Sequence, residues 1–547
     1  MLLVGINAKY IHSNLAIRYL SKIEPKFRFC EYTISDRPET IAASLFKTGA
    51  KTFLFSCYIW NIEHIEKICE ILKKADSSIK IALGGPEVSF DARERLTKNS
   101  HVDFILCGEG ETSISLFASG LETGDFSHVP GLCYREKGEV KESLEVAKEA
   151  VLETIPFPYD EEDIKALSNR IIYYETSRGC PYRCAFCLSG AAGNLRFLPI
   201  DRVERELSFF EGHDIPLVKL VDRTFNADPK RALQIIEGIK KRGGKTTYHF
   251  EIRAESMTEA LIKSLQEAPT GMFQLEIGVQ STQPDTLKAI NRNPKHDRLV
   301  SVVEALSKNQ NIHLHLDLIA GLPGESLEQF ICSFHDVMAL RPHALQLGFL
   351  KKLKGSALSA AGSEFWSFPP YEVIHSDKMS YEELLSLKQV EEMLERYYNS
   401  GVFTKTVAYI LDTYYAGREF NFFYDMAAYL KGNTAPKSQK TAYEELYQFA
   451  CMQWKDNIII ECLIYDYCRG HRDSLSFMKS DEGLKTRAFE FLKKPERVKK
   501  YFVNYAGEKP VLLYKKIRFV SIGSRVFAFD YEDNRAVDVT DEFKLEE

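Results

Sequence analysis

Short apolar runs alternate with amphipathic helical patterns through the first 125 residues of the chain. The apolar runs predict strands at residues 2–6, 29–34, 52–57, 79–83 and 103–107, and the segments between them predict helices near 14–22, 39–47, 62–74 and 90–98. Strands that alternate with helices favour a parallel, doubly wound α/β sheet. In such a Rossmann-like domain the ligand lies outside the carboxyl ends of the strands.

A second alternating region covers residues 170–350. Six strand-like runs occur there, at 171–176, 217–221, 246–251, 273–278, 313–319 and 344–347, and helical patterns separate them. Six β/α units are too few for a closed eight-stranded barrel. As in full barrels, we expect active residues at the carboxyl ends of these strands.

Two regions without this alternation complete the chain. Residues 126–169 predict a linker with a hairpin at Lys137-Gly138 and an acidic run at 160–163 that starts a solvated helix. Residues 351–547 predict a mostly α-helical domain, in which capping boxes at 380–383 and 441–444 open long helices, the second reaching about Tyr467. Runs at 512–514, 518–522 and 526–529 predict a small antiparallel β unit. The domains are therefore expected at 1–125, 170–350 and 351–547.

Composition narrows the class of protein. The chain has 547 residues, a net charge of −6 and 12 cysteines, which are too sparse for a disulfide scaffold. The acidic balance disfavours a broad nucleic-acid surface and a polybasic membrane anchor, although a nucleic-acid substrate stays open. Residues 1–7 lack the basic start of a signal peptide, and no stretch approaches the roughly 20 apolar residues of a membrane span. A reducing, cytoplasmic location is expected.

Three cysteines lie in one short loop after the first strand of the second region. Cys180, Cys184 and Cys187 have the spacing C-x3-C-x2-C, which lets three thiolates bind one [4Fe–4S] cluster and leaves one iron without a protein ligand. A zinc site is the alternative, but zinc normally takes four ligands, and no cysteine or histidine pair lies nearby. Cys451, Cys462 and Cys468 are spaced 11 and 6 residues apart, which does not favour a second cluster.

This cysteine loop resembles the signature of the radical S-adenosylmethionine (radical SAM) superfamily. Gly84-Gly-Pro86 and Gly108-Glu-Gly-Glu111, which follow strands of the first domain, resemble the cobalamin-binding domain that precedes many radical SAM barrels. The order of the three regions along the chain resembles a family of cobalamin-binding radical SAM proteins. Members of this family are similar to class B methyltransferases and carry a C-terminal domain of unknown function. The resemblance implies a partial (β/α)6 barrel for the second region.

The resemblance also implies which residues bind S-adenosylmethionine (SAM). Phe186 would pack near the adenine, Asp222 and Arg223 would meet the methionine amino group, and Glu251 and Arg253 would bind the ribose and the carboxylate. Further along the chain, the run that ends in Gln280 and Ser281 and the turn with Gly321 and Leu322 match segments around SAM. For the charged residues, ordinary ion pairs are the alternative.

For cobalamin, the resemblance implies contacts from the strand-end loops. The residues are Asn7, Lys9, Tyr10, His12, Ser56, Tyr58, Gly84, Gly85, Pro86, Gly108, Glu109 and Gly110. The D-x-H-x-x-G motif of other cobalamin proteins is missing, so His12 is more simply a loop histidine than a cobalt ligand. The first strand is not followed by G-x-G-x-x-G, which disfavours a nicotinamide cofactor. A receiver-type signalling domain would require acidic residues where the chain has Asn7 and Lys9.

The implied activity is reductive cleavage of SAM on the cluster to a 5′-deoxyadenosyl radical, followed by cobalamin-dependent methylation of an unactivated carbon. A non-methylating rearrangement and a non-catalytic iron–sulfur protein are the alternatives, and the SAM-type motifs argue against the second. An external electron donor such as flavodoxin or ferredoxin is expected, with a small-molecule or peptide substrate that the sequence does not identify. We also expect the loops 10–12 and 56–60 to face the top of the barrel.

Overall fold

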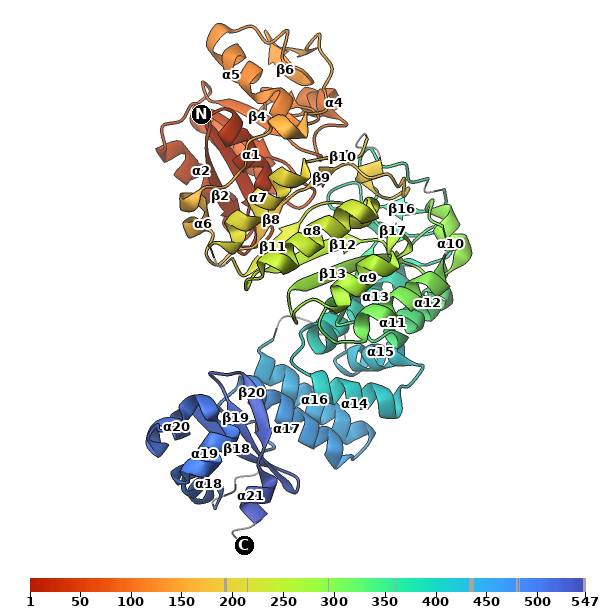
Figure 1. Ribbon diagram of the computed structural model, residues 1–547. Coiled ribbons are helices and arrows are strands. Elements are labelled where there is room, and N and C mark those ends of the chain that lie inside the picture. Colours follow the sequence, from red (N-terminus) through yellow and green to blue (C-terminus); the bar gives the residue numbers. More distant parts are fainter. Residues whose placement is uncertain are drawn as a thin grey trace. The chain divides into compact units, whose positions relative to one another are not determined.

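A computed structural model describes residues 1–190, 194–213, 215–293, 295–359, 361–431, 437–478, 481 and 483–544. The chain forms two compact units (Figure 1). The first unit comprises residues 1–333 and 347–384, and the second comprises 334–346 and 385–547.

The first unit begins with a seven-stranded sheet in the order β2-β1-β3-β4-β5-β6-β7. Its strands are β1 (Leu2–Asn7), β2 (Arg28–Thr33), β3 (Thr52–Ser56), β4 (Lys80–Gly84), β5 (Phe104–Leu106), β6 (Leu132–Glu136) and β7 (Glu139–Glu142). The first five pair in parallel, as the alternation predicts, and the last two are antiparallel. The hairpin predicted in the linker is confirmed, and it extends this sheet.

Helices cover both faces of this sheet, which explains why every residue of β1 is buried. The helices are α1 (Leu15–Ile23), α2 (Pro38–Lys47), α3 (Ile62–Ala75), α4 (Ala92–Lys98) and α5 (Ile114–Thr123). Because successive side chains of a strand point to opposite faces, Leu2, Val4 and Ile6 join the core under α2 and α3. Leu3 joins the other core with Ile17 and Phe117. The doubly wound prediction is therefore confirmed.

A second sheet of six strands follows, in the order β15-β14-β13-β12-β11-β8. Its strands are β8 (Ile172–Tyr174), β11 (Leu217–Leu220), β12 (Thr247–Ile252), β13 (Phe273–Gln280), β14 (His313–Ala320) and β15 (Ala344–Phe349). The helices between them are α7 (Ile200–Glu211), α8 (Pro229–Arg242), α9 (Glu259–Gln266), α10 (Pro284–Ala289), α11 (His296–Ser307) and α12 (Leu327–Ala339). The order matches the partial barrel that the sequence predicts.

Burial alternates strictly along β13 and β14, so each strand has one apolar and one more polar face. Leu275 and Ile277 are buried, whereas Glu276 between them is only partly buried. On β14, His315 and Asp317 lie on the corresponding face. This alternation places a row of ionisable side chains on the inner face of the partial barrel.

Short elements complete the first unit. They are α6 (Glu161–Ala166), the antiparallel ribbon of β9 (Ser177–Arg178) and β10 (Arg196–Phe197), and the pair β16 (Glu364–Phe365) and β17 (Val373–His375). Asp160 and Asp163 form a capping box at α6, as the acidic run predicts. The expectation of a solvated start is wrong for Asp163, because its carboxylate lies 2.6 Å from the guanidinium of the buried Arg18.

The second unit is mostly helical and ends in a three-stranded antiparallel sheet. After α13 (Tyr381–Leu394) its helices are α14 (Thr404–Tyr414), α15 (Glu419–Tyr429), α16 (Gln439–Gln453), α17 (Asn457–Gly470), α18 (Leu484–Lys493), α19 (Pro495–Tyr501), α20 (Pro510–Lys516) and α21 (Thr540–Lys544). The sheet comprises β18 (Ile517–Ile522), β19 (Arg525–Asp530) and β20 (Arg535–Asp538).

Two predictions for this unit are wrong, both for local reasons. The strand at 512–514 lies inside α20, where Pro510 supplies a preorganised first helical residue. The single helix from Thr441 to Tyr467 is two helices, because Ser438 caps α16 and Asp456 caps a new helix, α17. The capping box at Ser380 is confirmed by its reciprocal hydrogen bonds with Glu383.

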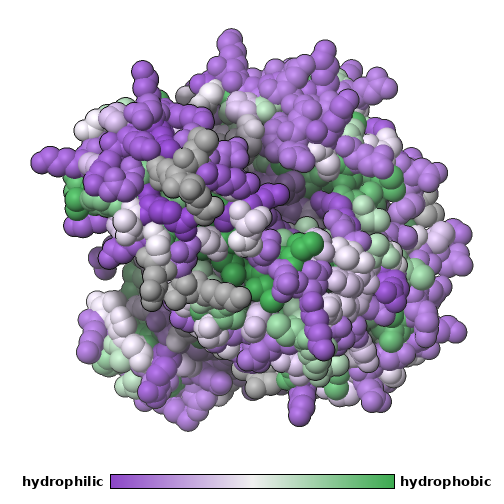
Figure 2. Space-filling view, turned by 90° about the horizontal axis from the view of Figure 1, so that it is seen from below, coloured by the Kyte–Doolittle hydropathy of each residue, from purple (hydrophilic) through white to green (hydrophobic). Residues whose placement is uncertain are grey.

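The exposed surface agrees with the composition. On the face drawn in Figure 2 hydrophilic side chains predominate, in line with the 27% of charged residues. None of the helices in the described part of the chain has the length and apolar character that crossing a bilayer requires.

Candidate functional site

A cavity of about 620 Å³ lies between the strand-end loops of the first sheet and the start of the barrel. Tyr173, Glu175, Arg178, Val221 and Arg223 line it from the barrel side. Every residue that the sequence assigns to cobalamin lines it except Lys9 and Tyr10. The cavity therefore occupies the place outside the carboxyl ends of the strands where doubly wound domains bind ligands.

Gly84 and Gly85 give this cavity a glycine-built wall. Gly85 has a φ of +110°, and a Cβ atom there would lie 2.6 Å from the carbonyl oxygen of Cys57. Asn61, which sequence reasoning missed, donates its side-chain amide to the carbonyl oxygens of Ile6 and Ser56. The loop after β4 thus packs against the end of β3 at a distance that only a glycine allows, and both glycines line the cavity.

His12 lines the cavity but already has a partner. Its Nδ1 lies 2.6 Å from the hydroxyl of Tyr173. Burial and the positive charges of Lys9 and Lys219 lower the pKa of His12, which favours the neutral imidazole. The neighbouring carbonyl of Ile11 accepts a hydrogen bond from the backbone N–H of Ile171. Loop 10–12 therefore contacts the barrel at the amino-terminal entry to β8, and not at the carboxyl ends of the strands, where we expected the contact.

The cysteine loop leaves β9 and is tied to the barrel by its backbone. The N–H of Ala185, next to Cys184, donates to the carbonyl of Ile290, and the thiol of Cys180 lies 3.5 Å from the hydroxyl of Thr224. Within the described ranges, no three His, Cys, Asp or Glu side chains are placed as ligands of a single metal ion. Three thiols on one short, partly exposed loop are the donor set that an iron–sulfur cluster uses.

Cys184 is partly buried beside two arginines, and its pKa is raised above the ordinary value. Burial raises the pKa of Cys184, whereas the guanidinium groups of Arg292 and Arg253 act in the opposite direction. Arg253 also stacks over the ring of Tyr182 at 3.8 Å and pairs with Glu255. Thus the ion pair expected as the alternative for Arg253 is present, and the residue also lies beside the cysteine loop.

Asp222 and Arg223, predicted at the methionine amino group, have different environments. Asp222 is buried and accepts hydrogen bonds from the backbone N–H and hydroxyl of Thr176 and from the hydroxyl of Ser177. The alternative of a surface ion pair is wrong for Asp222, because only 1% of this residue is exposed. Arg223 is exposed and lines the cavity.

The inner face of the barrel holds an ionisable network of which the sequence analysis singled out only Glu251. Glu276 accepts hydrogen bonds from His249 and Lys219 at 2.9 and 3.1 Å. Burial alone would raise the pKa of Glu276, but these two partners lower it to about 2. Burial and the neighbouring carboxylates of Glu276 and Glu251 raise the pKa of Asp317 well above its ordinary value. Burial likewise raises the pKa of Glu251. The sequence did contain a signal for this network, namely the polar residues at every second position of β12, β13 and β14.

The remaining residues predicted at SAM lie at the ends of β13 and β14. Gln280 has a φ of +73°, at a register shift between the two strands, and Ser281 is buried. Gly321 has a φ of +80°, and a Cβ atom there would lie 2.8 Å from a methyl group of Val373. Leu322 is fully buried, and Phe186 is partly buried in the cysteine loop. Their contacts with SAM stay predictions.

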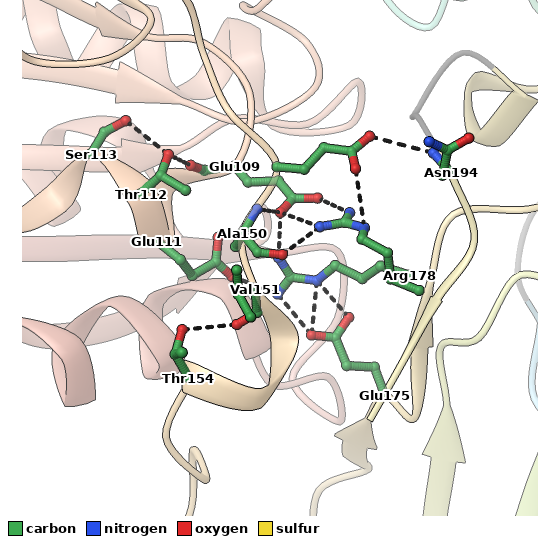
Figure 3. Close-up of polar contacts among 12 residues, drawn as sticks. Glu109, Glu111, Thr112, Ser113, Ala150, Val151, Thr154, Glu175, Arg178 and Asn194 are labelled. Atoms are coloured by element: carbon green, nitrogen blue, oxygen red, sulfur yellow. Dashed lines mark hydrogen bonds and ion pairs between the residues drawn. The ribbon is translucent and has the colours of Figure 1, made fainter. Parts of the chain in front are cut away.

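The carboxylates of Glu109 and Glu111 are already bonded to arginine side chains and are not free to contact a ligand in the cavity. Arg178 bonds Glu111 and Glu175, and its Nη1 lies 3.3 Å from Glu109 (Figure 3). Arg196 and the backbone N–H of Ala150 also donate to Glu109. Although burial alone would raise the pKa of Glu109, the partners Arg196 and Ala150 hold it below its ordinary value. Sequence reasoning missed Arg178, although it stands two residues before Cys180.

Three family models match separate parts of the chain. They are the B12 binding domain over residues 1–118, the radical SAM superfamily over 174–336, and a protein family of unknown function, DUF4080, over 361–541. The first two coincide with the cavity loops and with the cysteine loop.

Curated relatives share the first two regions. A 2-(S-pantetheinyl)-carbapenam-3-carboxylate methyltransferase of Streptantibioticus cattleyicolor is 26% identical over 313 residues, which cover 54% of this chain and 45% of that protein. The cobalamin-dependent radical SAM methyltransferase TokK of Streptomyces tokunonensis is 28% identical over 294 residues, covering 50% and 43%. The chain therefore spans less than half the length of these two relatives.

Solved structures share the fold at low sequence identity. The cobalamin-dependent SAM radical enzyme OxsB with aqua-cobalamin bound matches with a TM-score of 0.60 and 16% identity over 92% of this chain and 84% of that chain. The radical SAM methyltransferase TsrM from Kitasatospora setae, with cobalamin and a [4Fe–4S] cluster bound, matches with a TM-score of 0.55 and 14% identity over 68% and 81%. These likenesses show the fold.

The matched domains are those that hold a [4Fe–4S] cluster with SAM, and cobalamin. Apart from residues 334–336, both matches lie in the first unit, and loops of both line the cavity. The chain therefore combines, in this order, a B12 binding domain, a radical SAM domain and a C-terminal domain of a protein family of unknown function.

Proposed function

We propose that this protein is a cobalamin-dependent radical SAM methyltransferase that acts on an unactivated carbon. The observation that carries the proposal is the cavity, because residues of the cobalamin-type loops and of the barrel line it together. Arg178 belongs to that lining and stands two residues before Cys180. Methyl transfer to a carbon radical requires the two cofactors to act on one substrate, and a shared cavity provides for this.

The bound groups would supply the reductive cleavage of SAM and the transfer of a methyl group. Per turnover, one substrate C–H, two SAM and two electrons give a methylated product, 5′-deoxyadenosine, methionine and S-adenosylhomocysteine. The protein's part is to bind and orient these groups. Cys180, Cys184 and Cys187 would hold the cluster, and the apolar lining of the cavity, including Leu54, Leu106 and Ile114, would limit access of water.

The barrel residues are assigned by position and residue type. Arg253, beside Cys184, is suited to the carboxylate of SAM because its fork can bind a carboxylate through two parallel hydrogen bonds. Glu251 lies on the inner face of β12 and suits the ribose hydroxyls. Arg223 lines the cavity and is a better candidate than Asp222 for a ligand contact, because the Asp222 carboxylate already has three donors.

The partners follow from the chemistry. Radical SAM domains need an electron donor, and we propose a small soluble one such as flavodoxin or ferredoxin in the cytoplasm. The substrate is proposed to be a small molecule or peptide that enters from the cavity side, where Arg223 is exposed.

Anaerobic reconstitution with iron, sulfide, cobalamin, SAM and a reductant tests the proposal. The wild-type chain is expected to form both 5′-deoxyadenosine and S-adenosylhomocysteine. The Cys184→Ala variant is expected to lose the cluster's absorbance and to form no 5′-deoxyadenosine, because two thiols do not retain the cube. The Cys332→Ala variant removes an exposed thiol outside the loop and is the matched control.

Three results would contradict the proposal in different ways. A full cluster and SAM cleavage in Cys184→Ala would refute the cluster assignment. Formation of 5′-deoxyadenosine without S-adenosylhomocysteine in the wild-type chain would indicate a non-methylating reaction. A wild-type chain that never retains cobalamin would refute the cobalamin assignment and leave the radical chemistry standing.

A further inference from the structure

Arg178 connects the two cofactor loops of the first unit. It lies on β9, next to Gly179 and two residues before Cys180. Its side chain is only 16% exposed, yet it is surrounded by three carboxylates. Two of them, Glu109 and Glu111, come from the loop that closes the cavity after β5, and the third, Glu175, comes from the barrel. A single guanidinium therefore bridges both domains (Figure 3).

The geometry uses most of the donors of Arg178. Its Nε lies 3.0 Å from both carboxylate oxygens of Glu175, and one Nη contacts Glu175 at 2.7 Å and also Glu111. The other Nη lies 3.3 Å from Glu109. Such a fork has a fixed direction, which a lysine ammonium would lack. The loop 108–111 is therefore held in one orientation relative to β9.

A second arginine reinforces the same link. Arg196 on β10 pairs in register with Arg178 on β9, and it donates to Glu109 and to the carbonyl of Ala150. At Gly179 a Cβ atom would lie 2.5 Å from the carbonyl of Asn194, so the β9–β10 ribbon closes tightly just before Cys180. A displacement of the cysteine loop would consequently move the arginines that hold loop 108–111.

We propose that Arg178 is a positioning residue that couples the cysteine loop to the cobalamin-side loop 108–111, so that loading of the cluster and binding of cobalamin favour each other. The proposal rests on the two cofactors of the proposed function. Coupling of this kind is reciprocal, because each ligand changes the affinity for the other by the same factor. Without Arg178, the three carboxylates would face one another in a largely buried place, and loop 108–111 would lose its fixed orientation.

The test measures the dissociation constant of aquacobalamin by its absorbance change, with and without the reconstituted cluster, on the same full-length chain. For the wild-type chain we expect binding at least about fivefold tighter with the cluster. For Arg178→Gln we expect this ratio to fall to about one, with unchanged iron content. Arg178→Lys keeps the charge without the fork and should give an intermediate ratio. Arg205→Gln, at an exposed arginine of α7, is the control and should keep the wild-type ratio.

A merely structural role would weaken cobalamin binding equally with and without the cluster, so a wild-type ratio retained in Arg178→Gln would overturn the proposal. A ratio of one measured for the wild-type chain itself would also overturn the proposal. If Arg178→Gln fails to fold, as judged by circular dichroism, Glu111→Gln replaces it and should lower the ratio in the same direction. An unchanged ratio in that variant would again overturn the coupling.

If the wild-type chain binds no aquacobalamin at all, the proposed function fails and the coupling is measured by amide hydrogen exchange instead. Loading the cluster is then expected to slow exchange of residues 107–113 in the wild-type chain and not in Arg178→Gln. Exchange that does not respond to the cluster in the wild-type chain would overturn the coupling independently of cobalamin.

Discussion

Replacing Glu325 by glutamine should change how the stability of the first unit depends on pH. Glu325 follows the turn after β14 and is fully buried. Its Oε1 accepts a hydrogen bond from the hydroxyl of Ser281, and among the described residues its Oε2 has no partner. Burial raises the pKa of Glu325 from 4.5 to about 7, and the hydroxyls of Ser281 and Ser333 limit the rise.

The sign and size of the effect follow from this shift. Between about pH 4.5 and pH 7 the folded protein keeps the proton on Glu325, whereas the unfolded chain has lost it. Unfolding therefore releases a proton, and the free energy of unfolding falls as the pH rises. A difference of about 2.5 pKa units at about 1.4 kcal/mol each gives a loss of about 3.5 kcal/mol, complete above about pH 7, of which about 3 kcal/mol falls above about pH 5. Glu325→Gln cannot ionise, so this loss should be absent.

Urea-induced unfolding of the cofactor-free chain, measured from about pH 5 to about pH 8, tests this reasoning. The free energies of wild type and Glu325→Gln should be similar at the acidic end and diverge by about 3 kcal/mol at the alkaline end, the variant being the more stable. The Glu328→Gln variant removes a neighbouring acid that is exposed and bonded to Ser326, and it should not show this divergence. Parallel curves for wild type and Glu325→Gln would refute the assigned burial and protonation.

Two further predictions concern local backbone geometry. Gly85→Ala should destabilise the first unit by about 3 kcal/mol and weaken aquacobalamin binding, because the new Cβ atom meets the carbonyl of Cys57 at a positive φ. Gly49→Ala has a φ of +73° with open space around it and should cost only about 1 kcal/mol, so equal losses in urea unfolding would contradict the steric argument. Ser438→Ala should lower the free energy of unfolding of the second unit by about 1 kcal/mol, because the Ser438 hydroxyl caps α16 by accepting a hydrogen bond from the N–H of Thr441. A larger loss in Thr441→Ala than in Ser438→Ala would instead support the helix start predicted from the sequence.

Periodicity predicts the two sheets because their strands are buried in simple ways. In β1 both faces are covered, so the run is continuously apolar, and in β13 one face is covered, so apolar and polar residues alternate. The cysteine loop could also be predicted from the sequence, since its three cysteines lie close together in the chain. Helix boundaries in the second unit were harder to predict, because α16 ends at Gln453 and Asp456 caps the next helix only three residues later.

The partners of charged side chains could not be predicted, for a different physical reason. The sequence correctly places Asp222 after a barrel strand, but its three hydrogen-bond donors come from Thr176 and Ser177, 46 and 45 residues earlier. A charge in a strand-end loop can meet a ligand, water or another loop, and its residue type suits all three. Only the packing of β8 against β11 decides among them for Asp222.

The same reasoning changes the meaning of the Gly108-Glu-Gly-Glu111 motif. Its position at a strand end correctly predicts that the loop lines the cavity. A Cβ atom at Gly108, where φ is +80°, would lie 2.7 Å from Ala147, and one at Gly110 would lie 3.1 Å from Leu20. The carboxylates, however, are bonded to Arg178, which lies 67 residues beyond Glu111 in the chain. Within one motif, then, the glycines are explained by close packing against Ala147 and Leu20 at the edge of the cavity, and the acids by the cysteine loop. A substitution at Glu111 should therefore be read first as a change in the link between the two loops, and only then as a lost contact with cobalamin.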